Sequence, residues 1–200
     1  MFPELITSRL VLRRLAAADA ESVFCYRSDP EVSRYQTWEP RDSCDVLSFI
    51  DRMSVDDPLV AGAWFQVGIV LIETGELIGD CGLHPRADDR RQVEVGVTVA
   101  PVYQGRGLAL EALDALLGFL FTASDTHRVF CSVDPRNVAC VRLMERVGMR
   151  KEAHHVQSLW VRTEWTDDLV FAILRKEWRK AAQPSATDNP DDAQRSREDH

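Results

Sequence analysis

Residues 93–113 read VEVGVTVAPVYQGRGLALEAL and carry the clearest structural pattern in the chain. Valines at every second position from 93 to 99 predict a β-strand. Pro101 ends that strand because it has no N–H group to donate to a neighbour. A turn with two glycines follows, and from Leu108 onward the spacing of apolar residues is helical. The stretch therefore predicts a strand, a glycine turn and the start of a helix.

A glycine turn in front of a helix is suited to binding an anion. The first N–H groups of a helix have no partner within the helix, and the helix dipole adds positive potential there. Gly105 and Gly107 would let a phosphate approach the backbone, and Arg106 adds a positive charge. The pattern is also compatible with a simple tight connection. It is not a Walker A loop, since no Gly-Lys-Ser/Thr closes it, and Leu110 occupies the third glycine position of a GxGxxG fingerprint.

Composition places the chain in a broad class. It has 200 residues, 45% of them hydrophobic, and a net charge of −8, which indicates an acidic globular protein without a broad basic surface for nucleic acid. The five cysteines are scattered without C-x-x-C spacing, which argues against a disulfide framework or a zinc site and suits a reducing compartment. No signal peptide or membrane-spanning run is recognisable. We therefore expect a cytoplasmic protein, monomeric or homodimeric, that binds neither metal, membrane nor nucleic acid.

Several motifs along the chain resemble one known family. Residues 104–109 (QGRGLA) resemble the Q/R-x-x-G-x-G/A pyrophosphate loop of the GNAT N-acetyltransferases. Other segments, in the matching order, resemble the RimJ/RimL-type branch that acetylates ribosomal-protein N-termini: TSRLVLR at 7–13, LIGDCGL at 77–83, EVG at 94–96, NVACVRLMERVGMRKE at 137–152, and EWTDD at 164–168 followed by Glu177-Trp178. The resemblance covers residues 5 to about 180.

The order of elements and this resemblance together imply an α/β (α+β) fold. We expect a mixed, mostly antiparallel central sheet of about six to seven strands flanked by helices. Strands are expected at 7–14, 64–72, 76–83, 93–99, 128–133, 154–161 and 165–174. Helices are expected at 17–27, from 43, from 108, and between 137 and 148. The acetyltransferase domain would span 1–182. Residues 183–200 form an acidic tail without aromatic or large aliphatic side chains, which we expect to be disordered.

The resemblance also implies a reaction. Acetyl-coenzyme A would donate an acetyl group to an amine, either a peptide N-terminus or a small molecule, by direct attack in a ternary complex. The turn would hold the pyrophosphate through backbone N–H groups, and the pantetheine arm would lie along the central strand like an added strand. The residues that the resemblance assigns to coenzyme binding are Val97, Val99, Gln104, Gly105, Arg106, Gly107, Leu108, Ala109 and Asn137.

Two residues are candidates for catalysis, and each has a second interpretation. Glu94 on the central strand could act as the general base, or it could be an edge carboxylate or a partner of Arg90 or Arg91. Cys140 stands where the family usually has Ser and could return a proton to the leaving thiolate, or it could be a small buried hydrophobe. Asn137 is well placed to cap a helix, either alone or while also contacting the coenzyme.

The chain departs from the family at two positions. Met144 stands where many members have a Tyr that acts as general acid, and Ser132 stands where others have a Glu. These differences leave the coenzyme site intact and the acid–base assignment open. A non-catalytic acyl-coenzyme A-binding or regulatory module on the same fold is therefore the alternative hypothesis.

Overall fold

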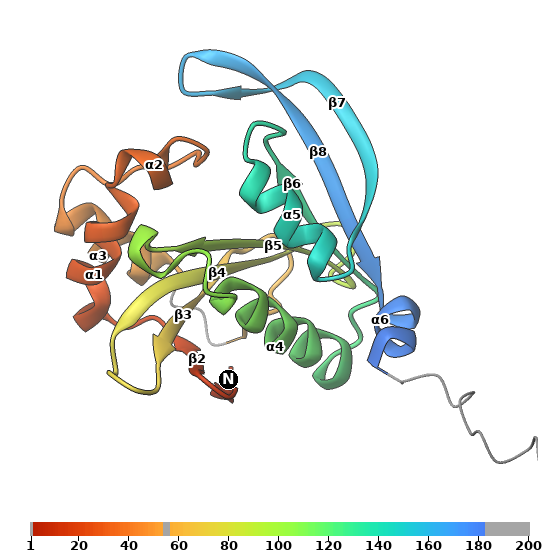
Figure 1. The fold of residues 1–200 in the computed structure, drawn as a ribbon, viewed down its shortest axis with the longest axis horizontal. Coiled ribbons are helices and arrows are strands. Elements are labelled where there is room, and N and C mark those ends of the chain that lie inside the picture. Colours follow the sequence, from red (N-terminus) through yellow and green to blue (C-terminus); the bar gives the residue numbers. More distant parts are fainter. Residues whose placement is uncertain (1, 54–56, 183–200) are drawn as a thin grey trace, which may run out of the picture.

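The computed structural model describes residues 2–53 and 57–182 of the chain. Within these residues, eight strands form one sheet in the order β1-β2-β3-β4-β5-β6-β8-β7 (Figure 1). The strands are β1 (Leu5–Ile6), β2 (Leu10–Arg14), β3 (Phe65–Leu71), β4 (Leu77–Pro85), β5 (Gln92–Val99), β6 (Arg128–Val133), β7 (Arg150–Val161) and β8 (Glu164–Leu174). The α-helices are α1 (Ala20–Arg27), α2 (Pro30–Ser33), α3 (Ser43–Arg52), α4 (Leu108–Ala123), α5 (Val138–Arg146) and α6 (Arg175–Ala182).

The sheet is mixed, as the sequence predicted. Only β5 and β6 are parallel, and every other neighbouring pair is antiparallel. The strand count slightly exceeds the expected six to seven because the two-residue β1 pairs with β2 at the edge. The strand expected over 7–14 begins only at Leu10, since Thr7 forms a turn in which its N–H donates to the Leu10 carbonyl at 2.9 Å.

The core lies on both faces of this sheet. Adjacent residues such as Ile69 and Val70 belong to different hydrophobic clusters, as alternation along a strand requires. The larger cluster lies under α4 and α5, and the smaller one lies under α1 and α3. Helix α4 lies across the sheet in Figure 1 and buries an apolar face made of Leu108, Ala112, Leu113, Leu116, Leu117, Leu120 and Phe121.

The central strand β5 separates from β6 partway along its length. It pairs with β4 from Pro85↔Val93 to Gly79↔Val99, but it pairs with β6 only at Gln92↔Arg128, Val93↔Val129 and Glu94↔Phe130. The Ala100 N–H donates to the Ile78 carbonyl at 2.8 Å, so Ala100 faces β4. Because backbone groups alternate in direction along a strand, those of Val97 and Val99 face the gap that β6 leaves.

Other expectations differ in detail. The helix expected over 17–27 is divided into a 3-10 turn at Ala17–Asp19 and the helix α1. Pro101–Tyr103 forms a second 3-10 turn between β5 and the glycine turn. The tail at 183–200, which we expected to be disordered, lies outside the described residues. Within the part that is described, no helix is long and apolar enough to cross a membrane.

Candidate active site

The glycine turn has the geometry that its sequence predicts. Gly105 and Gly107 adopt left-handed φ angles of 73° and 77°, which residues with a Cβ rarely adopt. Gly107 is the N-cap of α4, and its carbonyl accepts the first helical hydrogen bond from the Glu111 N–H at 3.1 Å. The N–H groups of the preceding helical residues therefore have no partner within the helix and remain available to a ligand.

A cavity of about 370 Å³ runs from this turn along β5 to α5. Of the residues that the resemblance assigns to coenzyme binding, those lining it are Val97, Val99, Gln104, Gly105, Gly107, Leu108, Ala109 and Asn137. Arg106 does not line the cavity. Its guanidinium lies over the ring of Tyr103, 5.4 Å from the ring centroid. We call this space the donor cavity, because its lining includes residues that the resemblance assigns to acetyl-coenzyme A, the acetyl donor.

Side-chain contacts tie both ends of the donor cavity to the fold. The Gln104 side-chain amide donates to the Val99 carbonyl at 2.8 Å, which shows that this carbonyl faces away from β4. The Asn137 side chain accepts a hydrogen bond from the Cys140 N–H at 3.1 Å and so caps α5. The predicted capping role of Asn137 is confirmed, and the same residue also lines the cavity.

A second cavity, of about 470 Å³, extends from β5 toward α1, α3 and the β7–β8 hairpin. We call it the acceptor cavity. It shares Val97, Asn137 and Cys140 with the donor cavity, so the two spaces meet at these residues. Its lining combines carboxylates with aromatic rings, among them Asp80, Glu94, Trp38 and Trp64.

The floor of the acceptor cavity is a buried ionic network. Asp80 is 1% exposed and accepts hydrogen bonds from Tyr26, Arg27 and Gln66. The Arg27 guanidinium also lies 5.6 Å from the ring centroid of Trp38. A buried charge is tolerated only when it is paired and hydrogen-bonded, and here both charges are. The network therefore fixes α1 against β4 and is electrically close to neutral.

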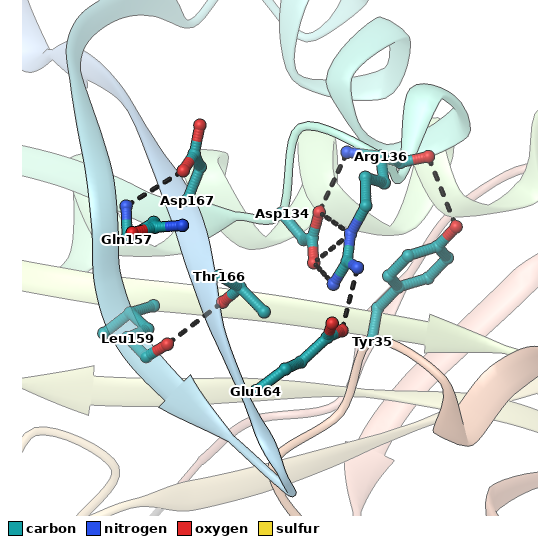
Figure 2. A network of polar contacts seen from close by, with 8 residues as sticks. All are labelled: Tyr35, Asp134, Arg136, Gln157, Leu159, Glu164, Thr166 and Asp167. Atoms are coloured by element: carbon teal, nitrogen blue, oxygen red, sulfur yellow. Dashed lines mark hydrogen bonds and ion pairs between the residues drawn. The ribbon is translucent and has the colours of Figure 1, made fainter.

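Three segments distant in sequence are joined by polar contacts beside the acceptor cavity, which Tyr35, Asp134 and Asp167 line (Figure 2). Arg136, in the turn before α5, contacts Asp134 of the same turn at 2.6 Å and Glu164 of β8 at 2.8 Å. The Tyr35 hydroxyl donates to the Arg136 carbonyl at 3.2 Å. Asp167 of β8 accepts from the Gln157 N–H at 2.9 Å, at the irregularity where the register of β7 shifts between His155 and Leu159.

A groove where two strands separate, ending at a glycine turn beside a helix N-terminus, matches the family to which the sequence is similar. The family model described as an acetyltransferase (GNAT) domain matches residues 9–150. This chain is a GNAT acetyltransferase family member. The uncharacterized N-acetyltransferase YoaA of Bacillus subtilis (strain 168) is 31% identical over 176 residues, covering 88% of this chain and 98% of that protein.

Relatives with named substrates are more distant. The spermidine N(1)-acetyltransferase of Vibrio cholerae is 26% identical, over 86% of this chain and 97% of that protein. The [ribosomal protein uS5]-alanine N-acetyltransferase of Escherichia coli (strain K12) is 25% identical, over 87% and 92%. Among solved structures, a GNAT-family acetyltransferase from Bacillus anthracis superposes with a TM-score of 0.78 at 28% identity, covering 88% of this chain and all of that one.

Glu94 lies in the acceptor cavity of this GNAT domain. Its side chain is 29% exposed, and one carboxylate oxygen lies 3.7 Å from His84 Nδ1. Burial raises the pKa of Glu94, the nearby charge of Asp168 raises it further, and His84 acts in the opposite direction. Arg90 and Arg91 form ion pairs with other residues, so the alternative pairing expected for Glu94 is absent from the described residues.

Cys140 lies where the two cavities of the GNAT domain meet. Burial raises the pKa of its thiol to about 11, so it is a neutral S–H group at physiological pH. A free cysteine thiol has a pKa of about 8.5, so Cys140 holds its proton more tightly than an exposed cysteine does. The described residues contain no group of three His, Cys, Asp or Glu side chains placed to hold a metal ion.

Sequence reasoning missed a carboxylate at the position of Ser132. The Ser132 hydroxyl donates to Asp168 at 2.5 Å, and Asp168 is only 8% exposed. A carboxylate of the neighbouring strand β8 thus lies beside the position at which some GNAT members carry a Glu. The available signal was an acidic pair, Asp167-Asp168, directly before the apolar run 169–174 of β8.

Proposed function

We propose that this protein transfers the acetyl group of acetyl-coenzyme A to a primary amine by direct attack within a ternary complex. The observation that supports this most strongly is the meeting of the two cavities at Val97, Asn137 and Cys140. An acyl donor in one cavity and an amine in the other would bring their reacting atoms together at this point. Such alignment can supply much of the rate enhancement of a two-substrate reaction.

The donor cavity provides the groups that a diphosphate and an extended arm require. Backbone N–H groups at the start of α4 would bind the pyrophosphate, and Val97 and Val99 would bond to the arm. Arg142 and Arg146 line the wall formed by α5, and neither forms an ion pair among the described residues. We infer that these two arginines balance the phosphate charge, a role that Arg106 does not support from its position over Tyr103.

The acceptor cavity provides a base. Glu94 would accept a proton from the bound ammonium, directly or through one water, so that the neutral amine can attack the thioester carbonyl. The C–N bond forms, the C–S bond breaks, and the thiolate departs along the donor cavity. Cys140 remains the candidate proton donor to that thiolate, although its raised pKa makes it a weak one.

The lining of the acceptor cavity favours an amine that is cationic and partly apolar. The buried Asp80 is neutralised by Arg27, whereas Glu94 in the lining has no arginine or lysine partner among the described residues, and neither has Asp168, whose charge acts on Glu94. Trp38 adds an aromatic surface suited to a cation or an alkyl chain. Spermidine and an alanine of ribosomal protein uS5, the acceptors named for two relatives, are both amines of this general class.

The test is thiol release from acetyl-coenzyme A with a panel of amines. The panel holds polyamines, peptides with different N-terminal residues, aminoglycosides and simple alkylamines, and thermal stabilisation by coenzyme A is measured in parallel. Turnover with one class identifies the acceptor and supports the proposal. Stabilisation without turnover on any amine would instead indicate a coenzyme-binding module. Absence of both would refute the donor site itself.

A further inference from the structure

The opening motif Thr7-Ser8-Arg9 lies against the first turn of α4 rather than in either cavity of the proposed reaction. One carboxylate, Glu111, accepts hydrogen bonds from all three residues: from the Thr7 hydroxyl at 2.6 Å, from the Ser8 hydroxyl at 2.9 Å, and from the Arg9 N–H at 2.9 Å. The Arg9 guanidinium adds a fork of two contacts to Glu111, each at 2.6 Å. The side chain of Arg9 is therefore held in one orientation.

The remaining nitrogen of this guanidinium, Nη1, contacts the glycine turn. Arg9 Nη1 donates to the Arg106 carbonyl at 3.0 Å. Arg9 Nη2 lies 3.6 Å from the position that a Cβ on Gly107 would occupy. Guanidinium donors are fixed in one plane, so a side chain that is held by Glu111 presents its remaining donor in a defined direction.

Fixing the Arg106 carbonyl also fixes the next N–H group. The Arg106 carbonyl and the Gly107 N–H belong to the same trans peptide plane, in which they point in opposite directions. With the carbonyl turned toward Arg9, the Gly107 N–H is turned away from it. Gly107 lines the donor cavity on one side and the surface cavity beside Arg9 on the other.

Few other contacts define this peptide plane. Gly105 and Gly107 both have left-handed φ angles, and a Cβ added to Gly105 would meet nothing within 4 Å. Glycine adopts many backbone conformations at little cost, so a turn of this kind needs external contacts to keep one shape. The Gln104 amide holds the start of the turn through Val99, and α4 holds its end. The Arg106 peptide lies between these two attachments.

We propose that Arg9 is a positioning residue for the donor: held by Glu111, it turns the Arg106–Gly107 peptide so that the Gly107 N–H faces the pyrophosphate. This inference rests on the proposed function, because it assumes that the turn binds a diphosphate. The charge of Arg9 is already balanced by Glu111, so Arg9 acts through the turn and not as a phosphate ligand. Burial acts to raise the pKa of Glu111, but hydrogen bonds from Thr7, Arg9 and Ser8 outweigh it and lower the pKa to about 2, so the pair stays ionised at physiological pH.

The experiment compares two acetyl donors that differ in the diphosphate. Acetyl-coenzyme A carries it, whereas acetyl-pantetheine presents the same thioester and arm without it. For Arg9→Gln we expect the KM for acetyl-coenzyme A to rise about tenfold with kcat nearly unchanged, since one charge-assisted hydrogen bond to the turn is lost. The kcat/KM for acetyl-pantetheine should stay at the parent value. The KM of Arg9→Lys for acetyl-coenzyme A should lie between those of the parent and Arg9→Gln, because an ammonium cannot contact Glu111 and the Arg106 carbonyl with the same geometry.

Two further variants separate positioning from other roles. Glu111→Gln releases Arg9 while keeping its positive charge, so positioning predicts a raised KM for acetyl-coenzyme A, whereas direct phosphate binding by Arg9 predicts an unchanged or lower one. Arg86→Gln is the matched control: Arg86 is similarly exposed and forms an equally close fork, with Asp88, away from the turn. It should leave both donors unaffected.

The outcomes also separate this inference from the proposed function. If the parent transfers acetyl from acetyl-coenzyme A but Arg9→Gln changes both donors equally, or changes only the melting temperature, Arg9 has a structural role alone and the inference is wrong. If Glu111→Gln lowers the KM, Arg9 binds phosphate directly and positioning is again wrong. If the parent binds no coenzyme and uses neither donor, the proposed function and the inference fall together.

Discussion

Replacing Gly105 by Ala tests the phosphate-binding turn most directly. The φ angle at Gly105 is 73°, and an added Cβ would meet no protein atom within 4 Å. The substitution therefore introduces no clash and costs only the left-handed conformation, roughly 1–2 kcal/mol for a residue with a Cβ. Reduced freedom of the unfolded chain returns about 0.4–1 kcal/mol. The net loss is about 1 kcal/mol, which lowers the melting temperature by roughly 2–4 °C in a domain of this size.

The chain contains a matched control for this backbone cost. Gly75, in the turn between β3 and β4, has a φ angle of 70°, and a Cβ added there would also meet nothing within 4 Å. It does not line the donor or the acceptor cavity. Gly75→Ala should therefore lower the melting temperature as much as Gly105→Ala does, without affecting the coenzyme.

The assay is thermal unfolding combined with calorimetric titration of coenzyme A. We expect Gly105→Ala alone to weaken binding, by about tenfold or more, because the methyl group fills the space through which a phosphate approaches the backbone. Equal melting temperatures with different affinities would separate backbone strain from ligand contact. If both variants bind coenzyme A as the parent does, no phosphate lies near Gly105 and the reasoning about the turn is refuted.

Three other substitutions give distinct results. Glu94→Gln should lower kcat about 100-fold and remove the rise of kcat/KM with pH on the acidic side, measured by thiol release. The pKa of Glu94 is raised in the folded state, so between its unfolded and folded pKa values the folded state binds more protons than the unfolded state. The stability of the parent therefore falls as pH rises between those two values. Glu94→Gln should be at least as stable as the parent at neutral pH. Asp80→Asn should cost about 3–5 kcal/mol in urea unfolding, since it leaves Arg27 buried without its counter-charge. Cys140→Ala should keep most of kcat because a thiol with a pKa of about 11 is a poor acid. A decrease in kcat of about 100-fold would instead support Cys140 as the proton donor to the thiolate.

The strand, turn and helix start that line the donor cavity could be predicted because their determinants are local in sequence. Alternating valines define β5, Pro101 ends it, and the glycines and the start of α4 follow within a few residues. The order of strand, turn and helix is therefore encoded in one continuous segment of the sequence. The exception is Arg106: a charge inside a loop was expected to face the ligand, whereas its guanidinium lies over Tyr103.

The acceptor side could not be predicted, because distant segments build it. Asp80 is part of a recognisable motif, but its partners Tyr26 and Arg27 lie 54 and 53 residues away on α1. Asp168 of β8 accepts a hydrogen bond from Ser132 of the neighbouring strand β6, 36 residues away in the sequence. The same cause shortened the first expected strand, since Thr7 turns toward Glu111, 104 residues away. Periodicity reports which face of an element is buried and carries no information on which polar groups meet across the fold.

The charges around the acceptor cavity affect the proton that an amine must lose before it can attack the thioester. The ion pair between Asp80 and Arg27 cancels itself, whereas Glu94, which lines the cavity, has no arginine or lysine partner among the described residues. The same holds for Asp168 beside it, which accepts a hydrogen bond from a serine hydroxyl. Both attract an ammonium, and burial together with Asp168 raises the pKa of Glu94. Every unit by which that pKa approaches the amine's, about 8 for an α-amine and 10.4 for lysine, removes about 1.4 kcal/mol from the cost of proton transfer. In the proposed reaction, burial of Glu94 would lower the cost of deprotonating the bound amine, and amines of lower pKa would be favoured.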